Sequence, residues 1–392
     1  MREYDFTTVI DRRGIGSLKW DEMAEYGVTG DGIVPLSNAE MEFYNCPEIT
    51  EGLQQYLDHI VMSYFRPLPS YYEAVCSWFE RRHAFKFAPE CIVPNNSLHM
   101  AVETAITAFT KPGDGVMMFT PVWPGFFFGN GSDRHEVHLP LIPKDNTYFI
   151  DFDAFEKAAQ DPENTLLLFC SPHNPAGRVW RRDELERMAD ICARNNVLII
   201  SDEIHCDIVR PGFTHIPMAS VNETAANITV MLSGCSKCFN IAGLDTSNII
   251  ILNGELRKRF QRRRGEQGMT RPNMLGLKAT ELGLTKGEEW LDQCNAVIDG
   301  NFKLVKNFLR ERLPMITCTE LEATYLMWLD MRALGIEAEE LGKRLMAEAK
   351  LFLDDGFYFG EGYEGFQRVN IAVPEKVILA AMERLEAFVK SL

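Results

Sequence analysis

Short apolar runs alternate with amphipathic segments through the middle of the chain. Between residues 92 and 253, runs of four or five mostly apolar residues predict strands at 116–119, 137–141, 166–169, 197–200, 228–232 and 248–251. Amphipathic segments predict helices at about 98–109, 183–195 and 254–264. Strands that alternate with helices are typical of a mostly parallel sheet with helices on both faces, so the pattern predicts an α/β fold.

The pattern differs on both sides of this region. Residues 1–46 carry glycines, prolines and single aromatics without a period, which indicates an irregular arm, and helices follow at 47–59 and 71–83. The last third predicts a long helix from 284 to 309, an apolar run at 324–331, a helix at 337–349 and a final helix from 375. We therefore expect an arm (1–46), a large domain (47–284) and a small α+β domain (285–392) that includes part of the arm.

Composition narrows the class of protein. In 392 residues, 40 Lys and Arg stand against 56 Asp and Glu, a net charge of −16, which argues against binding nucleic acid or anionic membrane. The basic run at 257–264 predicts a solvated helix face. Ten cysteines without paired spacing and a charged start predict a reducing cytoplasm. No apolar run approaches the roughly 18 residues that a bilayer requires.

Polar clusters directly follow three of the predicted strands. The sequence SPHNPAG follows 166–169, SDEIHCD follows 197–200, and SGCSK follows 228–232. Ligands of parallel sheets bind beyond the carboxyl ends of the strands. We therefore expect the three clusters to meet in one crevice.

Lys237 stands at the centre of the third cluster, between small residues and the apolar segment that follows. Loss of hydration lowers the pKa of such an amine and makes it nucleophilic toward an aldehyde, as in Schiff-base lysines. The alternative is a surface lysine on a loop. The other two clusters must decide between these interpretations.

Asp202 closes a strand of apolar residues, and a buried carboxylate needs a positive partner. A protonated pyridine ring would be one such partner. A metal site formed by Asp202, Glu203, His205, Cys206 and Asp207 is an alternative. Asn174 precedes Pro175, which favours extended geometry, and its amide could donate to a phenolate oxygen of a cofactor.

Several stretches together resemble the fold-type I pyridoxal 5'-phosphate (PLP) enzymes of the class I/II aminotransferase superfamily. They are DRRGIGSLKWD, NAEMEF, CSPHNPAGRVW, SDEIHCDIV, SKCFNIAGL and GFQRVN, in the same order. Within the superfamily, the chain is similar to the MalY/PatB group of cysteine-S-conjugate (cystathionine) β-lyases. The resemblance covers essentially the whole chain and implies a large PLP-binding domain with a mostly parallel, seven-stranded type of sheet.

The resemblance also implies roles for individual residues. Lys237 is expected to form the Schiff base, Asp202 to pair with the pyridinium, and Asn174 to contact the phenolic oxygen. Arg368 is expected to bind the substrate carboxylate, and Tyr64 to reach the phosphate and substrate of a neighbouring subunit, which implies a homodimer. His205 and Trp123 would line the cofactor, with Trp123 stacked on its ring. Phosphate is expected at the helix start near Asn96, Ser97 and Leu98, with hydroxyl donors from Ser233 and Ser236.

The chain departs from the superfamily pattern at several positions. Asp245 stands eight residues after the lysine, where typical aminotransferases carry a phosphate-binding arginine; the β-lyase group also tends to lack that arginine. Ile15 replaces a frequent threonine, and Trp123 a frequent tyrosine. Arg271 of a neighbouring subunit is a candidate for the missing positive charge.

These expectations define the predicted function. A PLP-dependent C–S β-lyase would eliminate a thiol from cystathionine or another S-substituted cysteine and yield pyruvate and ammonia, with Lys237 as the general base. The alternatives are an aminotransferase, a regulatory PLP protein that acts by protein contact, and a metal hydrolase. No metal is part of the favoured interpretation.

Overall fold

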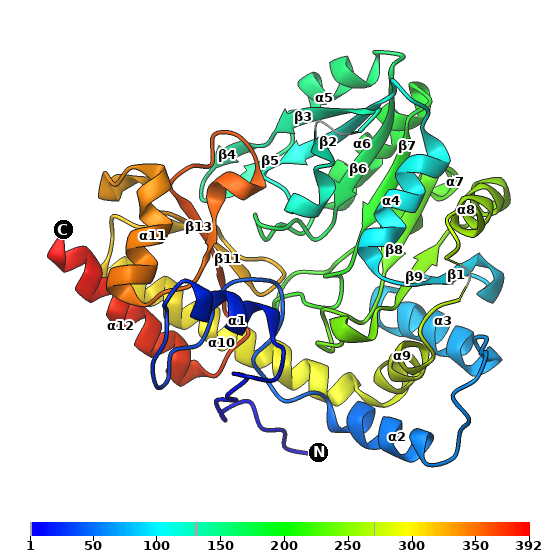
Figure 1. Cartoon of the computed structure of the whole chain (residues 1–392). Coiled ribbons are helices and arrows are strands. Elements are labelled where there is room, and N and C mark those ends of the chain that lie inside the picture. The colour runs from blue at the N-terminus through cyan, green and yellow to red at the C-terminus, as the bar shows by residue number, and fades with distance from the viewer. Residues whose placement is uncertain (1, 130–131, 270) are drawn as a thin grey trace.

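The computed structural model describes residues 2–129, 132–269 and 271–392. Its largest element is a seven-stranded sheet in the order β1-β9-β8-β7-β6-β2-β3 (Figure 1). The strands are β1 (Ile92–Asn95), β2 (Gly115–Thr120), β3 (His135–Pro140), β6 (Asn164–Cys170), β7 (Leu198–Asp202), β8 (Thr229–Ser233) and β9 (Ser247–Ile250). The neighbours from β3 to β8 run parallel, which confirms the predicted α/β fold with a mostly parallel sheet.

The exception to parallel pairing lies next to Lys237. Strand β9 runs antiparallel to β8, and β1 runs antiparallel to β9. The link between β8 and β9 carries the lysine and only the short 3-10 turn η5 (Ala242–Leu244). A parallel return usually needs an α-helix as its crossover, and this link contains none, so the chain reverses direction instead. Strand β1 is the one strand of this sheet that the hydrophobic pattern did not identify.

Helices cover both faces of the large sheet. On β2, Val116 and Met118 pack against α4 (Leu98–Phe109) and α8 (Gly254–Glu266). Met117 and Phe119 point to the opposite face, where α5 (Phe152–Ala159), α6 (Arg182–Arg194) and α7 (Glu223–Ile228) pack. Because successive strand residues alternate between two buried faces, the strands are apolar along their whole length.

Local chemistry sets where the helices begin. The Ser97 side chain caps α4 by accepting a hydrogen bond from the amide of Met100 at 3.3 Å. Asn253 and Asn273 cap α8 and α9 (Met274–Lys286) in the same way, which satisfies amides that have no partner within the helix. Proline, whose fixed φ suits the first turn, opens α2 (Pro47–Leu57) and α3 (Pro69–His83).

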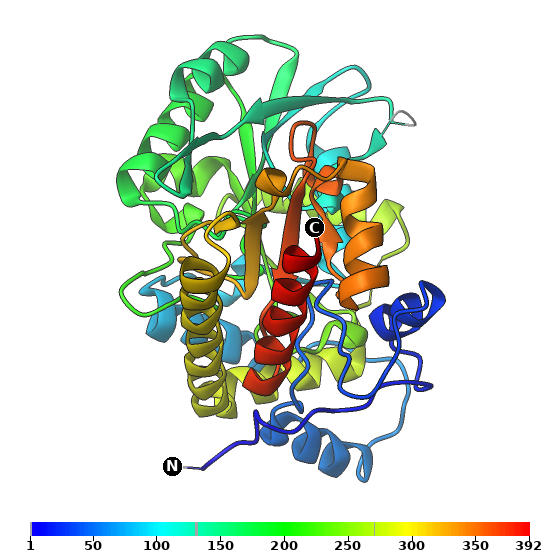
Figure 2. The ribbon, with the colours of Figure 1, turned by 90° about the vertical axis from the view of Figure 1, so that its left-hand side faces the viewer.

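The last third forms a second, four-stranded antiparallel sheet in the order β10-β11-β13-β12. Its strands are β10 (Thr317–Cys318), β11 (Leu326–Asp330), β12 (Asp354–Asp355) and β13 (Phe366–Asn370). They share a core with α10 (Glu288–Arg312), α11 (Ala338–Ala349) and α12 (Glu375–Ser391), and Figure 2 shows α12 beside α10. A small hairpin pairs β4 (Ile142–Lys144) with β5 (Thr147–Phe149). The domain boundaries at 46 and 284 stay a prediction.

The amino-terminal arm lies against this small sheet in both views (Figures 1 and 2). The amide of Leu36 donates to the carbonyl of Phe352, and the amide of Glu42 to that of Ala372, each at 2.9 Å. The arm also contains the helix α1 (Leu18–Glu25), which the sequence pattern did not predict. A lysine, Lys19, is among its buried residues and interrupts the apolar period.

Two other expectations need correction. The long helix expected from 284 to 309 is divided at Gly287, where a Cβ atom would come within 2.6 Å of the Phe239 ring.

The basic run at 257–264 is also not a fully solvated face. Arg257 donates to the carbonyl of Ile251 at 2.7 Å and Arg263 to the hydroxyl of Thr107 at 3.0 Å, which ties α8 to β9 and α4. Among the described helices, none is long and apolar enough to cross a membrane.

Candidate active site

The ends of β6, β7 and β8 meet at one cavity, as the polar clusters predicted. These strands are parallel neighbours, so Asn174, Asp202 and Lys237 follow their carboxyl ends at the same edge of the sheet. The cavity holds about 740 Å³ of space, including its open mouth. Eight of the predicted site residues line it: Ser97, Leu98, Trp123, Asn174, Asp202, His205, Ser236 and Lys237. Other lining residues were not predicted: Ala39, His99, Cys170, Ile204, Ala242, Asp245 and Thr246.

The amine of Lys237 faces the cavity and not bulk solvent. Its Nζ atom donates to the carbonyl oxygen of Ala39 at 2.7 Å. Burial lowers the pKa of Lys237 to about 8; the positive charge of Arg368 acts in the same direction, and the negative charge of Asp202 opposes it. About a tenth of the amine is therefore unprotonated at pH 7 and about half at pH 8, far more than for an ordinary lysine, as a nucleophile or general base requires.

Asp202 lies at the floor of the cavity, with 4% of its surface exposed. The amide of Ile204 donates to its Oδ1 at 3.1 Å. Burial raises the pKa of Asp202 to about 7, although this hydrogen bond and the charge of Lys237 favour the ionised form. A cationic group in the cavity would hold the carboxylate ionised.

Asn174 and Arg368 connect the two sheets. Arg368, on β13, donates from Nη1 to Oδ1 of Asn174 at 3.1 Å. Since this oxygen is an acceptor, the amide nitrogen of Asn174 is the group available to donate to a ligand. Arg368 does not line the cavity itself and reaches it through Asn174.

Asp354 and Phe359 hold Arg368 from the other side. The Nε and Nη2 atoms donate to Oδ2 of Asp354 at 3.0 and 2.7 Å. The guanidinium lies 4.7 Å from the centre of the Phe359 ring. The arginine is thus nearly fully buried, with its charge balanced and its orientation fixed.

His205 and Trp123 line the cavity with their rings. Burial keeps the pKa of His205 well below its usual value, so the ring is neutral, and its Nδ1 is buried without a partner among the described residues. The ring lies edge-on to Tyr325, with centroids 5.7 Å apart. Trp123 packs edge-on against His99 and Phe126.

The start of α4 lies at the cavity, where the sequence predicted an anion site. Ser97 and Leu98 place the amino-terminal end of this helix at the cavity, and Ser236 lies on its wall. Asn96 and Ser233 do not line the cavity; the carbonyl of Asn96 instead accepts a hydrogen bond from Ser247 at 2.5 Å.

Thr246 is a site residue that sequence reasoning missed. Its Oγ1 is buried, lacks a partner among the described residues, and belongs to a residue that lines the cavity. The available signal was a hydroxyl residue directly after Asp245, beside the position of the missing arginine.

Tyr64 and Arg271 lie outside the cavity of this chain. The Tyr64 side chain is 88% exposed, and the Arg271 guanidinium lies 4.4 Å from the centre of its ring. The two residues expected to serve a neighbouring subunit therefore form one exposed pair. Their roles stay predictions.

The candidate metal ligands of SDEIHCD do not converge. Asp202 and His205 face the cavity, whereas Glu203 accepts hydrogen bonds from Ser201, His215 and the amide of Met218. Asp207 accepts a hydrogen bond from Trp78, and its Oδ1 lies 2.8 Å from His83. Asp207, Cys206 and His83 form a separate cluster of side chains. The five residues cannot bind one ion together.

Comparisons with known proteins agree with this geometry. The family model "Aminotransferase class I and II" matches residues 32–385. The chain is 37% identical to "Cystathionine beta-lyase PatB" of Bacillus subtilis over 379 residues, which covers 96% of this chain and 97% of that protein.

Two solved structures are also similar. Cystalysin from Treponema denticola, described as containing a pyridoxal 5'-phosphate cofactor, has 42% identity and a TM-score of 0.97 and covers 100% of both chains. The PLP-bound C–S lyase from Staphylococcus hominis, in complex with L-cycloserine, has 31% identity and a TM-score of 0.91 and covers 99% of both chains. The chain therefore belongs to the class I and II aminotransferase family.

Proposed function

We propose that the chain is a PLP-dependent C–S β-lyase, which releases a thiol, pyruvate and ammonia from cystathionine or another S-substituted L-cysteine. The observation that carries this proposal is the convergence of Lys237, Asp202 and Asn174 on one cavity, with Arg368 bonded to Asn174. The relatives named cystathionine β-lyase and C–S lyase support the reaction class.

The cavity fits PLP on its own chemistry. The Asp202 carboxyl, whose pKa burial raises, needs a cation such as a protonated pyridine nitrogen. The buried Oγ1 of Thr246 has no partner among the described residues and is suited to donate to a phosphate oxygen. The helix start at Ser97 and Leu98, with Ser236, would complete an anion site. Lys237 would bind the aldehyde carbon, and Trp123 would cover the ring.

Bound PLP supplies an electron sink for the bonds at the substrate α-carbon. Arg368 would bind the substrate α-carboxylate beside Asn174 as a two-pronged donor, through the second N–H groups of Nη1 and Nη2 that Asn174 and Asp354 leave free, and its link to Asn174 would fix that carboxylate relative to the cofactor. Lys237 would take the proton from the α-carbon, because its lowered pKa leaves much of the amine unprotonated near pH 8. Asp202 would stay ionised and hold the proton on the ring nitrogen.

We also propose a homodimer in the cytoplasm. The exposed pair of Tyr64 and Arg271 offers a hydroxyl and a positive charge to a neighbouring copy, whose phosphate site lacks the arginine that Asp245 replaces. All ten cysteines are free thiols, which suits a reducing compartment.

Incubation of the purified, PLP-loaded chain with cystathionine and no keto acid tests the reaction. A lyase releases pyruvate, ammonia and thiol in equal amounts under these conditions. Pyruvate is the better readout, because the protein's own thiols react with thiol reagents. Product that forms only when a keto acid is added would overturn the lyase and establish an aminotransferase.

A further inference from the structure

Residues 38–42 of the amino-terminal arm, here called the strap, contact the active-site lysine. The carbonyl oxygen of Ala39 accepts the hydrogen bond from Nζ of Lys237 at 2.7 Å, and Ala39 lines the cavity. The position of this carbonyl therefore decides where the amine points when it is free. The strap lies outside both sheets, so other groups must hold it in place.

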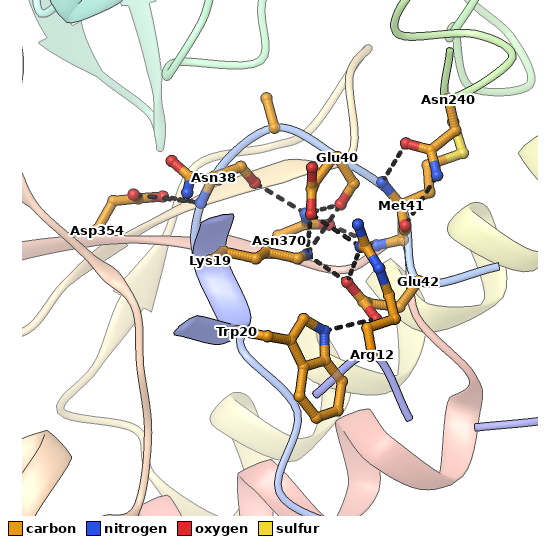
Figure 3. Close-up of polar contacts among 12 residues, drawn as sticks. Arg12, Lys19, Trp20, Asn38, Glu40, Met41, Glu42, Asn240, Asp354 and Asn370 are labelled. Atoms are coloured by element: carbon orange, nitrogen blue, oxygen red, sulfur yellow. Dashed lines mark hydrogen bonds and ion pairs between the residues drawn. The ribbon is translucent and has the colours of Figure 1, made fainter. Parts of the chain in front are cut away.

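Two asparagine side chains hold the strap from opposite sides (Figure 3). Asn240, three residues after Lys237, accepts from the amide of Met41 and donates to its carbonyl, both at 2.9 Å. Asn370, two residues after Arg368, donates to the carbonyls of Asn38 at 2.8 Å and Glu40 at 2.6 Å. The strap is thus bound to the segments that carry the lysine and the arginine.

A cluster of two buried charges, Lys19 and Glu42, and two half-buried charges, Arg12 and Glu40, holds the strap from a third side. Lys19 has 0% of its surface exposed, and its Nζ donates to the carbonyl of Glu40 at 3.1 Å. The same atom lies 2.9 Å from Oε1 of Glu42. Arg12 donates to the carboxylates of both glutamates at 2.8 Å, and Trp20 donates to Glu42 at 3.1 Å.

Stability alone does not explain a fully buried lysine in this position. A buried ion pair is often no more stable than well-packed apolar side chains of similar volume. In this cluster two positive and two negative charges balance, and one hydrogen bond, from Nζ of Lys19 to the Glu40 carbonyl, ends on the main chain of the strap. The cluster therefore fixes the position of the strap main chain as well as the charge beside it.

We propose that Lys19 is a positioning residue for Lys237, which holds the Ala39 carbonyl against the amine and, together with Glu40, sets the local charge around it. This inference rests on the proposed role of Lys237 as the cofactor lysine. Lys19 touches neither the cavity nor the amine and acts through the strap.

The charges of the cluster act on Lys237 with opposite signs. The positive charge of Lys19 lowers the pKa of Lys237, and the negative charge of Glu40 raises it, although burial is the largest effect. Loss of one charge should therefore shift the titration one way, and loss of the other should shift it the opposite way. The titratable and charged groups around the amine are Asp202 at the end of β7, His205 after β7, Asp245 after η5, Arg368 on β13, and Lys19 and Glu40.

The test is a pH titration of the PLP-loaded parent, Lys19→Met and Glu40→Gln. The visible absorbance of PLP bound to Lys237 is followed, and the pH at its midpoint is compared among the three proteins. We expect the midpoint to rise by about 0.5 to 1 pH unit in Lys19→Met and to fall by a similar amount in Glu40→Gln, as for partly screened charges. Lys258→Met and Glu255→Gln are matched controls, because they remove the members of an exposed pair 2.8 Å apart on α8. They should leave the midpoint unchanged.

Hydrogen exchange of residues 38–42 gives a second readout. Lys19→Met should speed exchange of the strap amides about tenfold or more, because a donor to the main chain is lost. If Lys19→Met does not fold, Lys19→Gln, which removes the charge but keeps a donor for the Glu40 carbonyl, should give the upward shift in its place. If the parent shows the absorbance but the midpoints of the two variants do not move, or move in the same direction, this inference is overturned. The proposed role of Lys237 then still stands. A PLP-treated parent without the absorbance overturns the role of Lys237 and this inference with it.

Discussion

Arg368 and Asn174 are joined by a hydrogen bond of 3.1 Å between side chains that lie 194 residues apart in the sequence. The arginine comes from the small antiparallel sheet, and the asparagine follows a strand of the large sheet. The group proposed to bind the substrate carboxylate therefore also orients a group proposed to bind the cofactor. A substitution of Arg368 should therefore also change the orientation of Asn174, and a substitution of Asn174 that of Arg368.

Arg368→Met should raise KM for the amino-acid substrate about 10- to 100-fold, the range of a lost charge-assisted pair of hydrogen bonds. The visible spectrum should also change, because Asn174 loses its partner. Arg344→Met removes a half-buried arginine that is paired with Glu348 on α11, away from the cavity, and should leave both properties unaltered. An unchanged KM in Arg368→Met would refute the carboxylate role.

Lys237→Ala should reduce pyruvate formation to background and abolish the visible absorbance of covalently bound PLP. The fold should persist, since the change removes an amine that burial disfavours in its charged form. Steady-state assays and unfolding curves measure both effects, with Lys258→Ala as the control. Substantial turnover in Lys237→Ala would contradict its role as the base.

Asp202→Asn should make the PLP-free chain more stable at high pH. Burial raises the pKa of Asp202 from 3.8 to about 7, so the folded state binds this proton more tightly than the unfolded state. The resulting stability is complete below the unfolded pKa and is lost as pH rises through the folded pKa. Across this window the parent should lose up to about 4 kcal/mol relative to the variant.

Thermal unfolding of the parent and of Asp202→Asn in a series from about pH 4 to pH 9 measures this difference. The gap in Tm should grow between pH 4 and pH 7 and then stay constant. Asp153→Asn, which changes a highly exposed carboxylate, serves as the control. A gap that does not depend on pH would rule out an elevated pKa for Asp202.

Gly276→Ala should destabilise the chain by about 1 to 3 kcal/mol and weaken PLP binding. The new methyl group would come within 2.5 Å of the Leu244 carbonyl and 2.8 Å of Thr246 Cβ, next to the proposed phosphate site. Gly300→Ala on α10 meets nothing within 4 Å and should stabilise by roughly 0.5 to 1 kcal/mol. If Gly276→Ala and Gly300→Ala change PLP affinity equally, the close packing of Gly276 against Thr246 does not support the phosphate site.

The sequence predicted the large sheet and the residues at its edge for a clear physical reason. Apolar strands that alternate with helices are typical of a buried, mostly parallel sheet, and the polar clusters after parallel strands share one edge, so Asn174, Asp202 and Lys237 could be placed together in advance. The helix at 98–109 was also predicted to the residue, because Ser97 and the apolar period mark its start.

The remaining features depend on distant partners. Nothing local indicates that the carbonyl of Ala39 meets Lys237, which lies 198 residues later. Lys19 breaks the apolar period of α1, so the helix was missed, and its burial is explained only by Glu40 and Glu42. The roles of Tyr64 and Arg271 depend on a second copy of the chain, which a single sequence cannot place.

The hydrogen bonds from Asn370 to the strap limit when this part of the active site can form during synthesis. Its amide bonds the carbonyls of Asn38 and Glu40, more than 300 residues earlier in the chain. The ribosome makes Asn370 more than 300 residues after the strap, so a nascent chain cannot close these two bonds before Asn370 has been synthesised. The carbonyl that orients the amine of Lys237 should therefore reach its final place late in folding, well after the lysine itself has been made.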